Sequence, residues 1–403
     1  MNGTDPGALS GLRVIELSTN LAGPYCAQLF GDLGADVIKL ESPAGDPTRN
    51  FGPRFAPGVS AHFMGVNGSK RAVCIDLSQP RGREVFLALL DTADVLIEGL
   101  KTGSLEKWGI GYADFLGDRF PRLVHCSISG FGATGPFAKF PGYDPVAQAM
   151  GGVYAMTGDP DGPPMRPAPL ISDLSTGLHA SFAIMAALRA RDASGRGQYI
   201  DIGLVDTTLP LMHPFFSYWL TGGEAYRPKR HGNRHPAGAP FDIFPTRNGY
   251  VVICVAQEHQ YRRLCEALGK PGLASDPRFR TNADRLANVD ALGEELAALT
   301  RDYESEPLAE KLLEANVPAG PILEVPAVIA HRQVQARELI LDGPDYKGVA
   351  TPFKMSASST ARGPAPRRGQ HSREVLRETG LAEAEIDALV ADGAVRDDED
   401  AAG

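Results

Sequence analysis

One carboxylate, Asp173, stands at the entrance of a segment of small apolar residues, "LISDLSTGLHASFAIMAALRA" (170–190). Gly177, Ala180 and Ala183 recur at three-residue spacing, and the segment predicts a helix from about 174 to 191. An Asp directly before a helix often caps it by accepting backbone N–H groups. The same position suits a nucleophile, because a helix N-terminus favours the ionised carboxylate. The pattern therefore predicts either a capping or a catalytic role for Asp173.

Several familiar catalytic signatures are missing from the sequence. The turn "STNLAGPY" (18–25) holds only Gly23 of the G-x-G-x-x-G pattern that binds a dinucleotide. The chain has no G-x-x-x-x-G-K-[ST], G-x-S-x-G or H-E-x-x-H motif, so nucleotide-loop, hydrolase and zincin chemistry lack their signatures. His231 and His235 lie in a basic loop without a cluster of Cys, Asp or Glu. We interpret them as solvated residues and predict no metal site.

Short apolar runs rich in Val and Ile alternate with helical patterns along the first part of the chain. Helices are predicted over 24–33 and 80–93, and a proline opens each of them. The predicted buried strands are 12–17, 35–40, 71–77, 93–99 and 123–130, with one more in 199–206. This alternation predicts an α/β fold with a Rossmann-like parallel sheet that has helices on both faces.

The pattern of the chain changes after about residue 140 and again after residue 222. Residues 135–169 are dense in Gly and Pro and are predicted to be loops around one short helix. Residues 241–256 read as a hairpin around Asn248-Gly249. We predict a small α+β domain over 223–333. The large Rossmann-like domain would then combine 1–222 with 334–403, which ends in an amphipathic helix.

Composition limits the classes of partner. The 403 residues carry a net charge of −9, and no basic stripe is present, so we predict no nucleic-acid binding. No run of about 18 apolar residues is present, so we predict no membrane span. The N-terminal "MNGTDPGALS" lacks the features of a signal peptide, and the five cysteines are scattered. These features predict a cytoplasmic protein.

A series of motifs runs along nearly the whole chain. It opens with "LSGLRVIELSTNLAGPYCAQLFGDLGADVIKLESPAGDPTR" and ends with "PAPRRGQHSREVL". Between them lie "NGSKRAVCIDLSQPRG", "ADVLIEGLKTGSLEKWGI", "SISGFGATGP", "GYDPVAQAMGG", "TGDPDGPP" and "SDLSTGLHASFAIMAAL". With these motifs the chain resembles the class III CoA-transferases, a group that includes formyl-CoA transferase, carnitine CoA-transferase and the alpha-methylacyl-CoA racemases.

The resemblance implies a chemical role for Asp173. In this family the acid at the start of that helix attacks the thioester of an acyl-CoA donor, and an aspartyl-CoA thioester forms by way of a mixed anhydride. The acceptor, a small carboxylic acid, then takes the CoA as the steps run in reverse. The resemblance also implies that coenzyme A and acyl-CoA are substrates, that no cofactor is permanently bound, and that two chains form a homodimer of interlocked rings.

Position 143 separates two activities within the family. The racemases carry a His-Asp pair where this chain has Tyr143 and Asp144. Racemisation needs two acid/base groups, and a tyrosine with a reference pKa of about 10 replaces His poorly. We therefore favour an acyl-CoA:carboxylate CoA-transferase. An acyl-CoA racemase or isomerase that uses Asp173 as a base is the alternative, and a CoA-ester binder without catalysis is a third interpretation.

The resemblance also assigns residues to CoA binding and to the surroundings of Asp173. Lys101 and Lys107 would contact phosphate groups. Gly238 lies in the loop 234–240, which matches a glycine-containing loop that covers the aspartate in the family. The implied CoA contacts are Leu21, Ala22, Ser42, Ile75, Asp76, Leu77, Ser78, Gly99, Leu100, Lys101, Lys107 and Tyr143. Candidates for holding a second carboxylate of the acceptor are Arg166, Arg227, Arg230 and Arg234.

Overall fold

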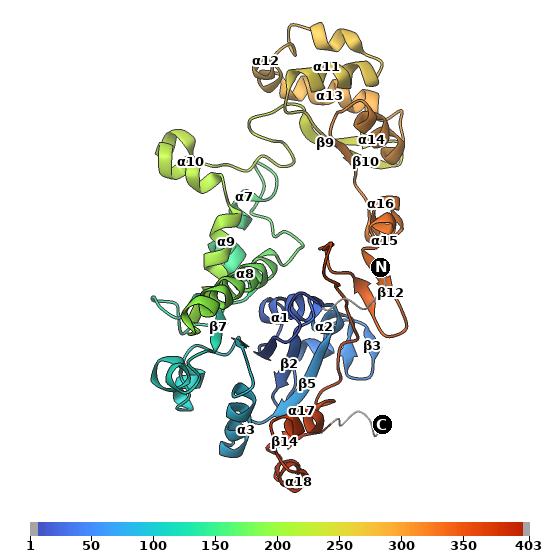
Figure 1. The fold of residues 1–403 in the computed structure, drawn as a ribbon. Helices are drawn as coiled ribbons and strands as arrows, with labels where there is room; N and C mark the ends of the chain where they lie inside the picture. Colours follow the sequence, from blue (N-terminus) through green and yellow to red (C-terminus); the bar gives the residue numbers. More distant parts are fainter. Residues whose placement is uncertain (1–6, 398–403) are drawn as a thin grey trace. The chain divides into compact units, whose positions relative to one another are not determined.

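The computed structural model describes residues 7–397, which divide into two compact units (Figure 1). The first unit takes in the chain up to Val153, then Ala168–Ser217, and the chain from Gln333 onward. The second unit consists of Tyr154–Pro167 and Tyr218–Arg332. Each unit has a hydrophobic core of its own.

The first unit is built on a seven-stranded sheet in the order β14-β5-β2-β1-β6-β7-β8. All strands run parallel except β14, which pairs antiparallel with β5. The strands are β1 (Arg13–Leu17), β2 (Asp36–Glu41), β5 (Lys70–Ile75), β6 (Val95–Glu98), β7 (Val124–Ser129), β8 (Tyr199–Gly203) and β14 (Val395–Arg396). The prediction of a parallel α/β sheet is confirmed, and the five predicted buried strands match β1, β2, β5, β6 and β7 within two residues at each end.

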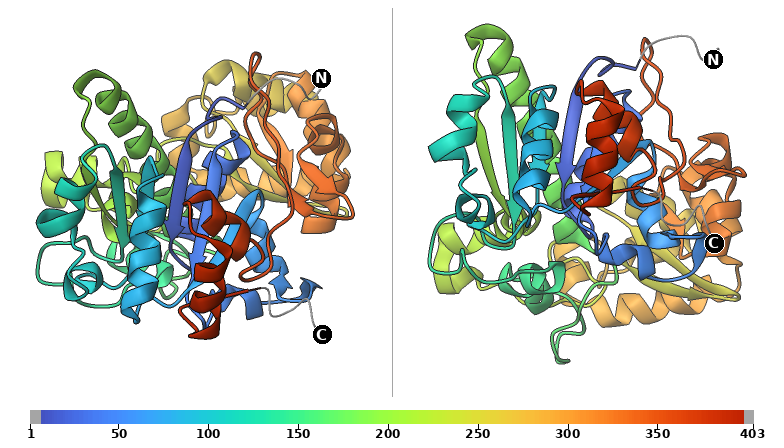
Figure 2. Two further views of the ribbon diagram at one scale, coloured as in Figure 1. Left: turned by 60° about the horizontal axis from the view of Figure 1, so that its bottom comes forward. Right: turned by 90° about the horizontal axis from the view of Figure 1, so that it is seen from below.

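Helices cover both faces of this sheet (Figure 2). Successive residues of a strand point to opposite faces, so Val14 enters one core and Ile15 enters the other. The core around Val14 takes side chains from α1 (Ala22–Asp32) and α8 (Ile171–Ser194). The core around Ile15 takes side chains from α3 (Pro80–Leu90), α17 (Ser372–Glu378) and α18 (Glu383–Ala391). Each buried Leu, Ile, Val or Phe side chain contributes roughly 1.5–3 kcal/mol.

Shorter elements complete the first unit, and three helices cross the limits between the units. Elements inside the unit are η1 (Pro47–Asn50), β3 (Arg54–Ala56), β4 (Val59–Ser60), α2 (Ala61–Asn67), α4 (Ser104–Lys107), η2 (Tyr112–Leu116), α5 (Gly117–Arg119), α6 (Asp144–Met150), α9 (Leu204–Leu211), β12 (Ile340–Asp342) and β13 (Lys347–Val349). The helices that cross the limits are α7 (Val153–Met156), α10 (Phe215–Gly222) and α16 (Arg332–Ala336).

The second unit contains an antiparallel sheet in the order β11-β10-β9. Its strands are β9 (Phe241–Thr246), β10 (Gly249–Cys254) and β11 (Ala319–Pro321), so the hairpin predicted around Asn248-Gly249 is confirmed. Its helices are η3 (Gly223–Tyr226), α11 (Glu258–Ala267), η4 (Pro271–Ser275), α12 (Asn282–Ala287), α13 (Val289–Thr300), α14 (Ser305–Glu314) and α15 (Val325–Ala330). The buried core of the unit lies between this sheet and helices α11, α13 and α14.

Two local features differ from the sequence predictions. The segment 199–206 is a strand only as far as Gly203, because α9 begins at Leu204. The carboxylate of Asp206 accepts the Gly203 N–H at the start of this helix. Residues 154–167 belong to the second unit, whereas the sequence placed them in the large domain. The guanidinium of Arg230 donates hydrogen bonds to backbone carbonyls of this segment, which ties it to the loop before β9.

Helix α8 begins at Ile171 and not near 174, so Asp173 lies inside its first turn. Within residues 7–397, α8 is also the one helix with the length and apolar composition that crossing a membrane requires. Ala180, Ile184 and Leu188 along it are buried in the core of the first unit.

Candidate active site

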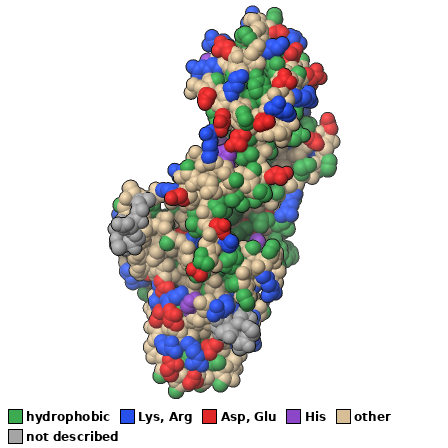
Figure 3. Space-filling model, turned by 90° about the vertical axis from the view of Figure 1, so that its right-hand side faces the viewer, with side chains coloured by type: hydrophobic (Ala, Val, Ile, Leu, Met, Phe, Trp, Pro, Cys, Tyr) green, Lys and Arg blue, Asp and Glu red, His purple; other side chains and the backbone are tan. Residues whose placement is uncertain are grey.

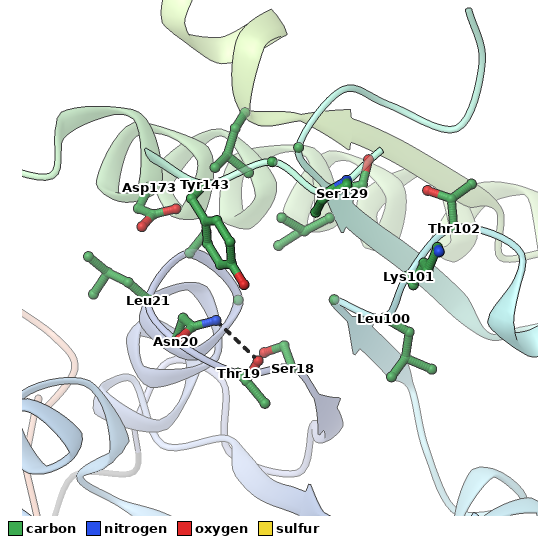
Figure 4. A pocket seen from close by; sticks show the side chains of 18 of the residues that line it. Ser18, Thr19, Asn20, Leu21, Leu100, Lys101, Thr102, Ser129, Tyr143 and Asp173 are labelled. Carbon is green, nitrogen blue, oxygen red and sulfur yellow. Dashed lines mark hydrogen bonds between the residues drawn. The ribbon is translucent and has the colours of Figure 1, made fainter. Parts of the chain in front are cut away.

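A cleft of the first unit lies where the strand order of the sheet reverses. β1 has β2 on one side and β6 on the other. In open α/β sheets, ligands bind at such a switch point, outside the carboxyl ends of the strands. The cleft encloses about 330 Å³ (Figure 4). Its walls are residues 18–23 after β1, 99–102 after β6, 128–130 at the end of β7, and 140–143, with Asp173 and Leu204.

Asp173 does not cap α8. The cap comes from Asp144, the first residue of α6, whose Oδ2 accepts the backbone N–H groups of Ser172 at 2.9 Å and of Asp173 at 3.1 Å. Asp144 is 2% exposed, and Gln148 donates a hydrogen bond to its other oxygen. The capping interpretation of Asp173 is therefore wrong, because a carboxylate from another helix already satisfies the free N–H groups.

The Asp173 carboxyl lines the cleft, and no residue in the described range donates a hydrogen bond to it. Burial raises the pKa of Asp173 to about 7, and the negative charge of Asp144 adds to the rise. The position at a helix N-terminus therefore does not keep the pKa of this carboxyl at its ordinary low value. A carboxyl of this kind changes its charge within the physiological pH range.

The first turn of α8 is fixed by contacts on two sides. On one side Gly177 lets the helix approach α1, because a Cβ at this position would lie 2.8 Å from the backbone oxygen of Ala22. On the other side two hydroxyl pairs at 2.6 Å tie α8 to α9: Ser172 with Thr208, and Thr176 with Thr207. The position of the Asp173 backbone is therefore set by packing and not by a loop.

Six of the predicted CoA contacts line the cleft together with Asp173. They are Leu21, Ala22, Gly99, Leu100, Lys101 and Tyr143. Figure 4 shows the side chains of Leu21 and Tyr143 beside Asp173, and Lys101 on the far side of Ser129 in that view. The buried carboxylate of Glu98 accepts the N–H of Leu100 at 2.8 Å, which fixes the start of the 99–102 wall. Lys101 is the one cationic side chain in the described lining of the cleft.

The structure does not bring the other predicted contacts to the cleft. Ser42 comes directly after β2, and residues 75–78 lie at and after the end of β5. They therefore lie along the same carboxyl edge of the sheet, on the side of β1 away from β6. Asp76 accepts hydrogen bonds from the N–H and the hydroxyl of Ser78, which lower the pKa of Asp76. Lys107 ends α4 and is exposed. Gly238 belongs to the second unit, where it lines a small hollow.

Three of the four candidate arginines already have partners within the second unit. Arg227 pairs with Glu224, and Arg234 pairs with Asp242 and Asp290. Arg230 donates to the backbone carbonyls of Ala155, Asp159 and Gly162. In the second unit, the ring of His235 stacks on Phe241 and accepts the N–H of Ala237. In the described part of the chain no group of three His, Cys, Asp or Glu side chains could hold a metal ion.

Sequence reasoning missed several residues of the cleft wall. Ser18, Asn20, Thr102 and Ser129 all line it. Each follows or ends a parallel strand, so the carboxyl ends of the predicted strands 12–17, 93–99 and 123–130 were the signal that pointed to them. The sequence does not show which two strands lie on either side of the switch point, and that order had to come from the structure.

These features define an α/β protein with a cleft at the switch point of a parallel sheet. The model of CoA-transferase family III matches residues 9–372, and the chain belongs to this family. The resemblance drawn from the sequence motifs is therefore confirmed.

Curated relatives and a solved structure agree with the family. The chain is 39% identical to a succinate–glutarate CoA-transferase of Agrobacterium fabrum, over 92% of this chain and 95% of that protein. It is 38% identical to an acetyl-CoA:oxalate CoA-transferase of Acetobacter aceti, over 94% and 97% of the two chains. The crystal structure of a CAIB/BAIF family protein from Brucella suis matches with a TM-score of 0.85 and 38% identity, over 93% of this chain and all of that one.

Proposed function

We propose that this protein is an acyl-CoA:carboxylate CoA-transferase whose acceptor is a small carboxylic acid. The observation that carries the proposal is the Asp173 carboxyl, which lines the switch-point cleft without a hydrogen-bond donor and whose backbone is held by Asp144. The names of the relatives support a dicarboxylate acceptor, since they refer to succinate, glutarate and oxalate.

The proposed reaction proceeds in four steps. The Asp173 carboxylate attacks the thioester carbon, and a mixed anhydride forms as CoA thiolate leaves. The thiolate attacks the Asp173 acyl carbon, which gives the aspartyl-CoA thioester and releases the donor carboxylate. The acceptor carboxylate attacks this thioester, and a second mixed anhydride forms as the thiolate leaves. The thiolate then attacks the acceptor acyl carbon, which yields the new acyl-CoA and restores Asp173.

The chain's residues supply position and charge for these steps. Asp144 holds the backbone of Asp173 in place, and the wall formed by Leu21 and Ala22 would contact CoA. The ammonium of Lys101 suits a phosphate oxygen, for which a flexible point charge serves well. We place the rest of CoA along the carboxyl edge of β2 and β5, where Ser42 and residues 75–78 lie, with Lys107 as a further phosphate contact. Gly238 is proposed to belong to the loop that covers the aspartate.

A transfer assay tests this function. Succinyl-CoA or acetyl-CoA is incubated with a panel of mono- and dicarboxylates, and new acyl-CoA products are separated by chromatography. We expect a new thioester with at least one acid, and none with Asp173→Ala. A folded wild-type protein that binds CoA but transfers it to no acid in a broad panel would contradict the proposal.

One observation is also compatible with the alternative of an acyl-CoA racemase or isomerase. A pKa of about 7 suits a general base as well as a nucleophile, so Asp173 could abstract an α-proton. Tyr143, at 63% exposed, would have to serve the opposite face of the α-carbon. Deuterium exchange at the α-carbon of a 2-methylacyl-CoA in heavy water, with no acceptor acid present, would favour this alternative over transfer.

We also propose that two chains form a homodimer of interlocked rings. Leu178, Phe182 and Met185 recur along one face of α8 and are 47%, 78% and 41% exposed, which is typical of an interaction surface. Further apolar side chains are open on the face drawn in Figure 3. Interlocked chains cannot separate while folded. When tagged dimers are mixed with untagged dimers, they should therefore exchange subunits only after denaturation. Exchange under native conditions would refute interlocking.

A cytoplasmic location is a further part of the proposal. It is supported by the inward face of α8, whose residues Ala180, Ile184 and Leu188 are buried in the core of the first unit. Cell fractionation should recover the protein apart from the membranes, and recovery with them after a carbonate wash would contradict this location.

A further inference from the structure

The wall of the cleft after β1 is a tight turn that needs support. Asn20 in this turn has a φ of 66°, a left-handed conformation that few residues other than glycine adopt. Gly23 packs directly against Ser18, because a Cβ at position 23 would lie 2.2 Å from the Ser18 hydroxyl oxygen. Leu21 and Ala22, two of the predicted CoA contacts, lie between these points. Their position therefore depends on what holds the two ends of the turn.

The ammonium group of Lys39 holds the first end. Lys39 lies on β2 and is fully buried. Its Nζ donates to the backbone oxygen of Ser18 at 2.9 Å and to Glu16 Oε1 at 3.1 Å, and it pairs with Asp46 at 3.1 Å. Two of the three ammonium donors are therefore in hydrogen bonds, and the charge is paired with two carboxylates.

The ammonium group of Lys70 holds the second end. Lys70 lies on β5 and is 4% exposed. Its Nζ donates to the backbone oxygen of Pro24 at 2.9 Å, to Glu16 Oε2 at 2.9 Å and to Asn67 Oδ1 at 2.8 Å. Pro24 lies in the first turn of α1, directly after the cleft wall. All three donors of this second ammonium are therefore in hydrogen bonds.

Glu16 joins the two lysines beneath the turn. Its two oxygens accept from both ammonium groups, and the Ser18 hydroxyl donates to Oε1 at 2.6 Å. The cluster is balanced, with three acids and three bases buried together: Glu16, Glu41 and Asp46 with Lys39, Lys70 and Arg49. Buried ion pairs often stabilise a protein no more than apolar residues of similar size would. The cluster is therefore better explained by the geometry that it imposes than by stability.

We propose that Glu16, Lys39 and Lys70 are positioning residues for CoA binding, which they serve by fixing the two ends of the turn that carries Leu21 and Ala22. None of the three lines the cleft, so they act through Ser18 and Pro24 and not by touching the substrate. The inference rests on the proposed function, because it takes CoA as the occupant of this cleft.

Direct binding of free CoA separates a positioning role from a structural one. The variants are Lys39→Met, which removes the bond to the Ser18 carbonyl, and Glu16→Gln, which nearly keeps the shape of the side chain and removes the charge that both ammonium groups contact. Matched controls are Arg362→Met and Asp32→Asn, each of which weakens the buried ion pair between Arg362 and Asp32. Calorimetry gives the Kd for CoA, and a thermal scan gives the Tm of the same sample.

Glu16→Gln should raise the Kd for CoA about threefold to tenfold, which corresponds to about one hydrogen bond, and Lys39→Met should raise it more. The two controls should lower the Tm and leave the Kd unchanged. Folded Lys39→Met and Glu16→Gln proteins with the wild-type Kd would overturn the inference, and Glu16→Gln decides alone if Lys39→Met does not fold. Wild-type protein that binds no CoA would instead refute the proposed function, and this inference with it.

Discussion

Replacing Asp173 by Asn should make the protein more stable above neutral pH. The folded protein raises the pKa of this carboxyl from an ordinary value of 3.8 to about 7, first through burial and then through the charge of Asp144. The protein therefore takes up a proton on folding at pH values between these two limits, and an ionised Asp173 carboxylate lowers the stability of the folded state. Asn has nearly the same shape and no charge, so it removes this cost.

The size of the effect follows from the shift. A rise of about three pKa units corresponds to a loss of about 4 kcal/mol in the free energy of unfolding. This is an upper value, because solvent reaches the partly exposed carboxyl and reduces the cost. The cost begins above pH 3.8, grows as the pH rises, and is complete above about 7. The advantage of Asp173→Asn over wild type should therefore grow by roughly 1–3 kcal/mol between pH 5 and pH 8 and then level off.

Scanning calorimetry of both proteins from pH 5 to pH 8.5 measures this difference. Asp114→Asn is the matched control, since Asp114 is an exposed acid of the same unit and its replacement should give a difference that varies little with pH. A difference between Asp173→Asn and wild type that is equal at pH 5 and pH 8, or that favours wild type at pH 8, would refute the reasoning about burial.

Three further predictions concern activity. The kcat/KM for the acyl-CoA donor should rise with pH around pH 7, as Asp173 becomes ionised. Asp144→Asn removes the like charge and should move this rise to lower pH, and an unchanged profile would mean that burial alone sets the pKa of Asp173. Lys101→Met should raise the KM for acyl-CoA about tenfold, and the effect should decrease at high salt. Lys107→Met should raise the KM less, because Lys107 lies outside the cleft, and equal effects of the two variants would contradict the geometry. Gly177→Ala should cost about 1–3 kcal/mol in unfolding experiments and lower activity, because its Cβ would press on the backbone of α1. Gly65→Ala in α2 has open space and should instead stabilise the protein by up to about 1 kcal/mol.

The sheet could be predicted from the sequence because its strands are buried on both faces. Runs such as "LRVIEL" and "RAVCIDL" are short, rich in Val and Ile, and separated by helical patterns, which leaves few other folds. One strand shows the limit of this reasoning. Lys39 interrupts "ADVIKL", yet it is fully buried, because Glu16 on β1 and Asp46 after β2 pair with it. Only the order of the strands reveals those partners.

The role of Asp173 shows a second limit. Local reasoning placed it either as the cap of α8 or as a reactive carboxylate, and both follow from a position at a helix start. The choice depended on Asp144, which supplies the cap from a separate helix, 29 residues away in the sequence. The raised pKa likewise comes from burial and from this second acid, and neither can be read from the residues next to Asp173. The resemblance of the sequence motifs to the CoA-transferase family pointed to Asp173 without any knowledge of these contacts.

The most direct test of the central claim is an intact mass spectrum of the protein after incubation with acyl-CoA donors, succinyl-CoA and acetyl-CoA included. The account predicts an added mass equal to CoA less one water, which peptide mapping places on Asp173 and which Asp173→Ala lacks. A protein that binds CoA but gains no such mass with any donor, or that carries it at another residue, would contradict the assignment of Asp173 as the nucleophile.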